Sequence, residues 1–263
     1  MDDMTKVLVT GSKGYIGQHL IKMLANTSYE VVEFEGDVTD PYTFYSVDTV
    51  IHLAALVRVN ESVKAPTKYY KNNVDGTINL LDRIVFNNFV FASSGTAARP
   101  DNPYALSKRI CEDIVEEKCK QKGASFTNFR FYNVTGSDGF RPTNPDGLLY
   151  NLMNAVETGK FYLHGTDYNT GDGTCIRDYI HVNEICEALI TAIHNPVNRL
   201  ENLGSGVGYS VKHIIDTFKR VNNVDFEVIE GPRRPGDLES TVLEKNSLYL
   251  HVTHSLEQLL KVY

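Results

Sequence analysis

A glycine-rich turn near the start of the chain constrains the fold more than any other feature. The stretch "VLVTGSKGYIGQHL" places Gly11, Gly14 and Gly17 between a strand-like run and a segment with helical spacing. Glycine suits these positions because the turn is tight, the backbone approaches a pyrophosphate, and the helix packs closely on the strand. The helix N-terminus then turns its positive dipole end toward the phosphates. We interpret the turn as a dinucleotide-binding site; the alternative is a glycine-rich turn that binds no ligand.

Strand-like and helical segments alternate through the first half of the chain. Buried strands are expected at "KVLVTG", "YEVVEFEG", "DTVIHLAA", "NFVFASS" and "SFTNFRFYNVTG", and helices at "YIGQHLIKMLAN", "KYYKNNVDGTINLLDRIVF" and residues 104–121. Such alternation implies right-handed crossovers and a doubly wound parallel sheet. The sequence therefore predicts an α/β protein with a Rossmann sheet.

After about residue 134 the regular alternation of strand-like and helical segments gives way to loop-like stretches and shorter elements. The stretch "TGSDGFRPTNPDG" is loop-like, "RDYIHVNEICEALITAIH" runs from a strand into a helix, and "GPRRPGDLEST" is a second loop. We predict a Rossmann domain formed by residues 1–134 with about 175–197. Residues of about 135–174 with 198–263 would form a smaller discontinuous region that caps it.

An acidic residue at the end of the second strand is expected to hold the adenosine ribose hydroxyls. Glu35 closes "EVVEFE", and a carboxylate there favours NAD because it would repel the extra phosphate of NADP. Glu33 competes for this role, and either residue could instead be a solvated surface acid. Asp37 follows closely and could reach the adenine.

Composition narrows the classes of partner. The formal net charge is −7, which argues against nucleic acid as the main partner. Since no segment approaches eighteen consecutive apolar residues, we expect no membrane span. The N-terminus lacks a signal-type pattern, which indicates a cytoplasmic protein. The cysteines at 111, 119, 175 and 186 form no CxxC pair, so we expect reduced thiols and no metal.

The stretch "SSGTAARPDNPYALSK" places Tyr104 and Lys108 on one face of a helix, ten residues after Ser94. A free phenol has a pKa of about 10 and is a poor base at neutral pH. A neighbouring ammonium and an oxidised nicotinamide ring would both favour the phenolate and so produce a general base. The alternative is a helix start with a packing tyrosine and an exposed lysine. The upstream dinucleotide turn favours the catalytic interpretation.

With these residues the chain resembles the extended short-chain dehydrogenases/reductases, and among them most of all the UDP-glucose 4-epimerases. The resemblance covers nearly the whole chain. It lies in "VLVTGSKGYIG", "DTVIHLAA", "ESVKAPTKYYKNNVDGT", "PYALSK", "RFYNVTG", "DGTCIRDYIHV", "NLGSGVGYSV" and "PRRPGDL".

The resemblance implies NAD-dependent epimerisation at C4 of a UDP-hexose through a transient 4-keto sugar. Tyr104 would be the base, Lys108 would hold the nicotinamide ribose, and Ser94 would bond the sugar hydroxyl beside Thr96. The residues implied for the UDP-sugar are Ser94, Thr96, Tyr104, Asn133, Arg177, Arg234 and Asp237. Those implied for NAD are Gly11, Gly14, Tyr15, Ile16, Gly17, Glu35, Asp37, Val38, Leu53, Ala54, Ala55, Asn73, Ser93, Tyr104, Lys108 and Phe131. The helices that contain Asn73 and Tyr104 would pair in a homodimer, as in many members.

The chain also departs from that family. Only twelve residues separate Glu35 from Asp48, so we expect the sheet to lack one edge strand. The loop between Ser94 and Tyr104 is shorter than usual. Leu148 stands where an asparagine supports the nucleotide, and Thr241 stands where some members have a bulky tyrosine in the sugar pocket.

Three other functions stay open. A nucleotide-sugar 4,6-dehydratase typically has an Asp-Glu pair after the catalytic threonine, whereas Ala97 and Ala98 follow Thr96 here. A reductase using exchangeable NADPH is disfavoured by Glu35. A catalytically silent protein that binds NAD or a nucleotide sugar is the third alternative.

Overall fold

The structure is a computed structural model that describes residues 4–40, 45–234, 237–244 and 252–262. The chain divides into two compact units, and both are discontinuous in sequence. The first unit comprises Met1–Phe131 and Cys186–Asn202, and the second comprises Tyr132–Ile185 and Leu203–Tyr263. Residues 175–185 therefore belong to the second unit, and residues 198–202 belong to the first.

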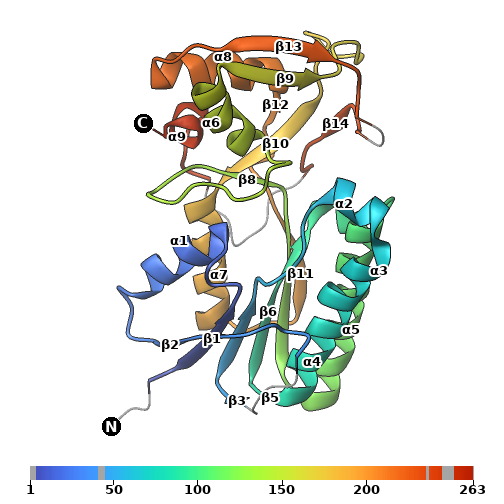
Figure 1. Ribbon diagram of the computed structural model, residues 1–263. Coiled ribbons are helices and arrows are strands. Elements are labelled where there is room, and N and C mark those ends of the chain that lie inside the picture. The colour runs from blue at the N-terminus through green and yellow to red at the C-terminus, as the bar shows by residue number, and fades with distance from the viewer. Residues whose placement is uncertain (1–3, 41–44, 235–236, 245–251, 263) are drawn as a thin grey trace. The chain divides into compact units, whose positions relative to one another are not determined.

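A six-stranded sheet forms the centre of the first unit (Figure 1). Its strand order is β11-β7-β6-β4-β1-β2, and the neighbours from β2 to β7 run parallel. Apolar runs such as that of β1 are fully buried, as is typical of a parallel sheet covered on both faces. The strands are β1 (Lys6–Thr10), β2 (Glu30–Glu33), β4 (Thr49–His52), β6 (Asn88–Ser94), β7 (Ser125–Phe131) and β11 (Arg199–Leu203). The predicted doubly wound α/β sheet is confirmed.

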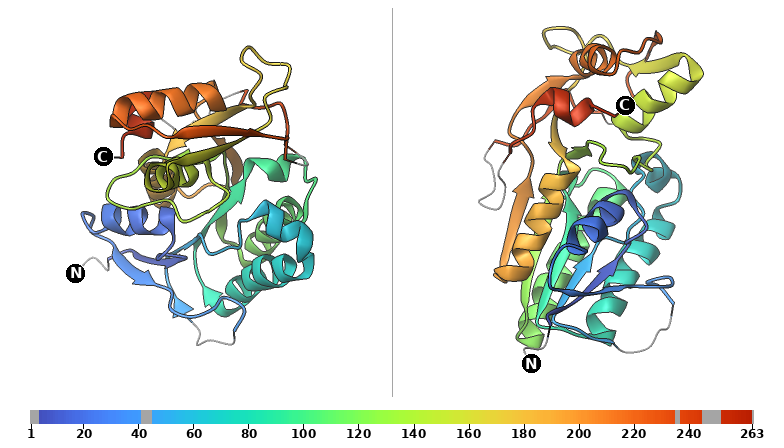
Figure 2. Two further views of the ribbon diagram at one scale, coloured as in Figure 1. Left: turned by 45° about the horizontal axis from the view of Figure 1, so that its top comes forward. Right: turned by 90° about the vertical axis from the view of Figure 1, so that its left-hand side faces the viewer.

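Helices cover both faces of this sheet (Figures 1 and 2). One face carries α4 and α5, which pack on the strands through a core that includes Leu80, Leu81, Cys111 and Val115. The other carries α1 and the later part of α7. The helical segments are α1 (Tyr15–Leu24), α2 (Val59–Lys64), α3 (Pro66–Tyr69), the π-helical η1 (Tyr70–Asp75), α4 (Gly76–Arg83), the 3-10 turn η2 (Gly95–Ala98), α5 (Pro103–Lys122) and α7 (Val182–His194).

Two details of the first unit bear on the sequence-based predictions. As the short segment before Asp48 predicts, β2 is an edge strand, and no described strand lies beyond it. The long helix predicted over residues 68–86 is wrong at its end, because α4 stops at Arg83. The β-branched pair Ile84–Val85 instead forms β5, which pairs with β3 (Tyr45–Ser46), and Ile84 is fully buried there.

The second unit is a smaller mixed α/β assembly. Its core brings together apolar side chains of α6, α8 and α9 with those of β9 and β13. Strand β10 pairs with β8, β12 and β14, while β9 pairs with β13. The elements are β8 (Asn133–Thr135), α6 (Leu148–Thr158), β9 (Lys160–His164), β10 (Ile176–His181), β12 (Gly208–Ser210), α8 (Val211–Asn222), β13 (Glu227–Gly231), β14 (Ser240–Thr241) and α9 (Leu256–Leu260).

Candidate active site

The glycine turn is packed so tightly that side chains are excluded from two of its positions. Gly11 has φ = +69°, and a Cβ atom there would lie 2.7 Å from the backbone nitrogen of Ala54. A Cβ atom on Gly17 would lie 2.2 Å from the carbonyl oxygen of Gly11. Gly14 caps α1 without a side-chain hydrogen bond, and the first turn of that helix carries no acidic residue. The turn therefore leaves the positive end of α1 available to an anion.

A cavity of about 290 Å³ opens beside this turn. Six of the residues predicted for the cofactor line it. Glu35 is one of them, and its competitor Glu33 is not among the lining residues. Asp37 accepts hydrogen bonds from the backbone and the hydroxyl of Thr39, which lower the pKa of its carboxyl. The predicted lining residues are Gly11, Glu35, Asp37, Val38, Ala54 and Ala55, and those that sequence analysis missed are Ser12, Lys13, Phe34, Gly36, Leu56 and Asn72.

A buried hydrogen-bond chain supports one wall of the cavity. The backbone N–H of Ala54 donates to Thr10 Oγ1 (3.2 Å), which lies 2.7 Å from Nδ1 of His52. Nε2 of His52 lies 3.0 Å from Thr77 Oγ1, whose hydroxyl donates to the carbonyl oxygen of Asn73 (2.6 Å). Since the Thr77 hydroxyl donates onward, His52 must carry its proton on Nε2 and accept at Nδ1. Burial lowers the pKa of His52 to about 3, so the ring is neutral at pH 7.

Asn73 is itself part of this wall. Its side chain is buried in the π-helical η1, accepts from the backbone N–H of Leu56 (2.9 Å), and donates to the carbonyl of Leu56 and the hydroxyl of Ser107 (3.0 Å each). Those contacts join the loop after β4 to α5. Asn72, its neighbour in sequence, lines the cavity. Its adjacency to Asn73 is the sequence signal that could have indicated it.

Helix α5 presents Tyr104 and Lys108 from its first two turns. Asn102 caps the helix by accepting from the N–H of Ala105 (2.9 Å), and Pro103 is its first residue. Both residue types favour a helix start, so the sequence fixes where Tyr104 enters the helix. The four-residue spacing then places Lys108 on the same face.

The end of β6 brings Ser94 to Tyr104. The compact η2 turn follows Ser94, whose hydroxyl lies 2.9 Å from that of Thr96. Burial raises the pKa of the Tyr104 phenol, and a hydrogen bond with Ser94 opposes this rise. We expected Lys108 to lower the pKa of Tyr104, and the structure differs, because desolvation dominates in the protein alone. The expected proximity of Ser94 to Tyr104 across a short loop is present.

Lys108 is a buried cation. Only 3% of the residue is exposed, its ammonium donates to the carbonyl oxygen of Ala92 (2.7 Å), and it lies 4.8 Å from the ring centre of Phe91. Desolvation lowers the pKa of Lys108 to about 8, against the opposing effects of Cys111 and Glu112. The side chain is therefore largely an ammonium at pH 7.

The remaining residues predicted for the cofactor also belong to the first unit. Tyr15 and Ile16 begin α1, and burial raises the pKa of the Tyr15 phenol. The N–H of Leu53 donates to the carbonyl oxygen of Thr10 (3.2 Å) and extends the pairing of β4 with β1. Ser93 and Phe131 are buried at the ends of β6 and β7.

The second unit gathers four of the residues predicted for the substrate. Arg177 on β10 lies 3.5 Å from the carboxylate of Asp237, whose N–H donates to the carbonyl of Arg234 (3.2 Å). Asn133 on β8 is exposed and donates to the carbonyl of Asp178 on the paired strand (2.8 Å). Residues 235–236, in the middle of the "PRRPGD" motif, lie outside the described residues.

Other kinds of site receive no support from the described residues. No group of three or more His, Cys, Asp and Glu side chains among them is arranged to hold a metal ion. The cysteines all fall within the described ranges, where they are buried and form no disulfide. Across those ranges, we find no helix with both the length and the apolar character that crossing a bilayer requires.

The fold and the site together define a class. A parallel sheet with a glycine turn after its first strand, and a Ser–Tyr–Lys set at β6 and α5, are the features of an extended short-chain dehydrogenase/reductase. A model of the NAD dependent epimerase/dehydratase family matches residues 7–204 of the chain. The chain belongs to this family.

Individual relatives agree with this assignment. The UDP-glucose 4-epimerase of Yersinia enterocolitica is 32% identical over an alignment 294 positions long, gaps included, which covers 88% of this chain and 87% of the relative. The crystal structure of UDP-glucose 4-epimerase from Brucella ovis in complex with NAD superposes with a TM-score of 0.86 at 28% identity, covering 97% and 96% of the two chains. The crystal structure of UDP-glucose 4-epimerase from Bifidobacterium longum in complex with NAD+ and UDP superposes with a TM-score of 0.82 at 26% identity, covering 97% of this chain and 96% of that chain.

Proposed function

We propose that this protein is an NAD-dependent UDP-glucose 4-epimerase, which interconverts UDP-glucose and UDP-galactose through a transient 4-keto sugar. The observation that carries this proposal is the meeting of Ser94 with Tyr104, one helical turn before the buried Lys108. The relatives named above support the nucleotide-sugar class. We also propose a cytoplasmic homodimer, as expected from the family.

The residues of the first unit fit NAD. The turn at Gly11 and Gly17 has no room for a Cβ atom, and the N-terminus of α1 is available to a pyrophosphate. Glu35 on the cavity wall suits the two hydroxyls of an adenosine ribose and disfavours a phosphate there. NAD held by these residues would supply hydride-transfer chemistry at C4 of the sugar and, in its oxidised form, a positive charge beside Tyr104.

Tyr104 would exchange a proton with the 4-hydroxyl of the sugar, and Ser94 would hold that oxygen in place. Because burial keeps the Tyr104 phenol protonated at neutral pH in the protein alone, its action as a base requires cationic neighbours. Lys108, on the next turn of the same helix, is the protein's own cation. It would also orient the ribose next to the reacting ring.

Arg177 and Arg234 would grip the diphosphate of the substrate. Planar guanidinium groups bind phosphate oxygens with two parallel hydrogen bonds and stay charged at every working pH. The carboxylate of Asp237 orients Arg177, from which it lies 3.5 Å. Asn133 on β8 would add a neutral contact to the nucleotide. A firm grip on the diphosphate leaves the sugar free to turn and present either face.

The test is proton NMR of purified protein mixed with UDP-galactose, read at the anomeric proton. The proposal predicts that the UDP-galactose signal decays to an equilibrium mixture with UDP-glucose, and that the same mixture forms from UDP-glucose. A spectrum that stays unchanged with both sugars, in a sample shown to bind NAD, would indicate a silent binding protein. A 4-keto-6-deoxy product would indicate a dehydratase, for which the buried Ala97 after Thr96 provides no acid.

A further inference from the structure

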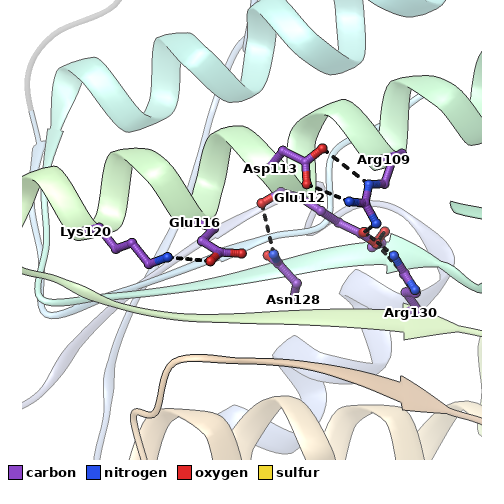
Figure 3. Close-up of polar contacts among 8 residues, drawn as sticks. Arg109, Glu112, Asp113, Glu116, Lys120, Asn128 and Arg130 are labelled. Atoms are coloured by element: carbon purple, nitrogen blue, oxygen red, sulfur yellow. Dashed lines mark hydrogen bonds and ion pairs between the residues drawn. The ribbon is translucent and has the colours of Figure 1, made fainter. Parts of the chain in front are cut away.

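Glu112 is a buried carboxylate on α5 to which the proposed reaction assigns no role. Only 1% of the residue is exposed. Arg130 on β7 grips it with two hydrogen bonds, Nε to Oε1 at 2.8 Å and Nη2 to Oε2 at 2.6 Å (Figure 3). The hydroxyl of Ser93 on β6 donates to Oε1 at 2.5 Å. A buried charge with this many partners is held in one position.

The carboxylate joins three elements at one point. Ser93 and Arg130 are directly opposite each other in the parallel pairing of β6 with β7, and both bond to Glu112. The side chain of Asn128, also on β7, donates to the backbone carbonyl of Glu112 (3.2 Å). Helix α5 is therefore fixed over a single register position of the sheet.

Three successive turns of α5 meet three successive residues at the end of β6. Tyr104 is close enough to Ser94 for that hydroxyl to oppose the rise in its pKa. Lys108 donates to the carbonyl of Ala92, and the buried carboxylate one turn further accepts from Ser93. The contact between Glu112 and Ser93 is therefore part of the same set of α5–β6 contacts that positions Tyr104 and Lys108.

The carboxylate also supplies charge where Lys108 needs it. The ammonium is buried among Phe91, Cys111 and, from β4, His52, whose ring is neutral at pH 7. Desolvation lowers the pKa of Lys108, and the carboxylate of Glu112 raises it. An ionised Cys111 thiolate would raise it as well. Burial raises the pKa of the Cys111 thiol, so it stays neutral at pH 7 and leaves the compensation to Glu112.

We propose that Glu112, clamped by Arg130, is a positioning residue that keeps Lys108 charged and holds the Ser93–Ser94 end of β6 against Tyr104. The part of this proposal that concerns reaction rate rests on the proposed function. The part that concerns the charge of Lys108 does not. The experiments below separate the two.

The chain offers a matched control on the same helix. Glu116 lies one turn after Glu112 and pairs with Lys120 at 2.5 Å, and both side chains of that pair are about half exposed (Figure 3). Exposed pairs of this kind contribute little to stability and are screened by solvent. Glu116→Gln therefore makes the same chemical change as Glu112→Gln without touching the buried network.

The direct test is an NMR titration of protein labelled with ¹³C at lysine Cε, with the Lys108 signal assigned by its loss in Lys108→Met. We expect a midpoint near pH 8 in the wild type and in Glu116→Gln. In Glu112→Gln the midpoint should fall by about one pH unit or more, as for loss of a nearby opposite charge. An unchanged midpoint in folded Glu112→Gln would overturn the proposal. Should that variant not fold, Glu112→Gln combined with Arg130→Gln removes the stranded charge. Because a cation is lost together with the carboxylate, the midpoint should fall in the same direction but by less than in the single variant.

The second test follows turnover of UDP-galactose from pH 6 to 9. In Glu112→Gln the alkaline limb of the rate should move to lower pH, with kcat at pH 8 reduced about fivefold or more and KM little changed. Glu112→Asp, which restores the charge, should recover the position of that limb. A profile identical to that of Glu116→Gln would leave Glu112 a purely structural residue. If the wild type itself turns over no UDP-sugar, the proposed function fails and the titration alone decides the role of Glu112.

Discussion

The rings of Tyr69 and Tyr104 meet edge to face, with centroids 6.5 Å apart and planes at 82°. Tyr69 is completely buried, and its hydroxyl is fixed by the N–H of Arg58 and the carboxylate of Glu61. The ring of Tyr104 thus has a rigid packing partner that does not depend on its own hydroxyl. Packing and proton transfer at this residue can be separated by experiment.

Tyr104→Phe should abolish activity without loosening the fold. The variant keeps the ring contact with Tyr69 and removes only the group that exchanges a proton. We expect turnover of UDP-galactose to fall by about 100-fold or more, the usual contribution of a general base, with a melting temperature close to that of the wild type. Tyr162→Phe, at a side chain 61% exposed in the second unit, is the control. Wild-type turnover by Tyr104→Phe would remove the tyrosine from the mechanism.

His52 should make the first unit sensitive to acid. Its pKa is about 3 when folded and about 6.5 when unfolded, so the unfolded chain binds the extra proton first as the pH falls. The free energy of unfolding should therefore drop by roughly 1.4 kcal/mol for each pH unit between about 6.5 and 3 on account of this residue. Urea unfolding at several pH values measures it. In His52→Gln this part of the slope should vanish, and equal slopes in both proteins would contradict the neutral ring proposed between Thr10 and Thr77.

Arg177→Lys should weaken substrate binding more than catalysis. Lysine keeps the positive charge but loses the planar fork that bonds two phosphate oxygens. We expect KM for UDP-galactose to rise about tenfold, equivalent to about 1.4 kcal/mol, with kcat nearly unchanged. Arg233→Lys is a control, because Arg233 is engaged with Asp167 and stacks on Tyr168. An equal rise in KM for both variants would argue that Arg177 has no special role.

Thr241 should admit an N-acetylated sugar. It is directly opposite Arg177 in the pairing of β14 with β10, and it is only partly buried. If this small side chain leaves space in the sugar pocket, UDP-N-acetylgalactosamine is a substrate of the wild type, and Thr241→Tyr loses that activity while retaining turnover of UDP-galactose. Parallel NMR assays with the two sugars measure both rates. Absence of activity on the acetylated sugar in the wild type would end this idea.

Much of the fold could be predicted because its signals are local. The glycine turn, the apolar strand-length runs and the Asn102-Pro103 helix start each fix nearby backbone, and the structure contains them all. The end of the predicted helix over 68–86 failed because Ile84 satisfies its backbone by pairing with Tyr45, a partner far along the chain. No local sequence pattern predicts a pairing between residues so far apart in the chain.

For the site, the sequence indicated the residues in motifs but not the polar residues that support them. Residues in recognisable motifs, such as Glu35 and Ala54, line the cavity, and their contact with a cofactor stays a prediction. The supporting polar residues His52, Glu112 and Arg130 were missed, because their partners are set by the register of neighbouring strands and by which helical turn faces them. In the sequence Glu112 is one of several charged residues of α5, and Arg130 follows other polar residues of β7, so no local pattern distinguishes them.

The most direct measurement of the central claim uses UDP-galactose that carries deuterium at C4. Removal of the C4 hydrogen as a hydride and its return to the other face would leave the label in place. We predict that the purified protein forms UDP-glucose that retains the deuterium at C4, with no label released to water. Absence of UDP-glucose, or product in which solvent hydrogen has replaced the label, would contradict epimerisation through a 4-keto sugar.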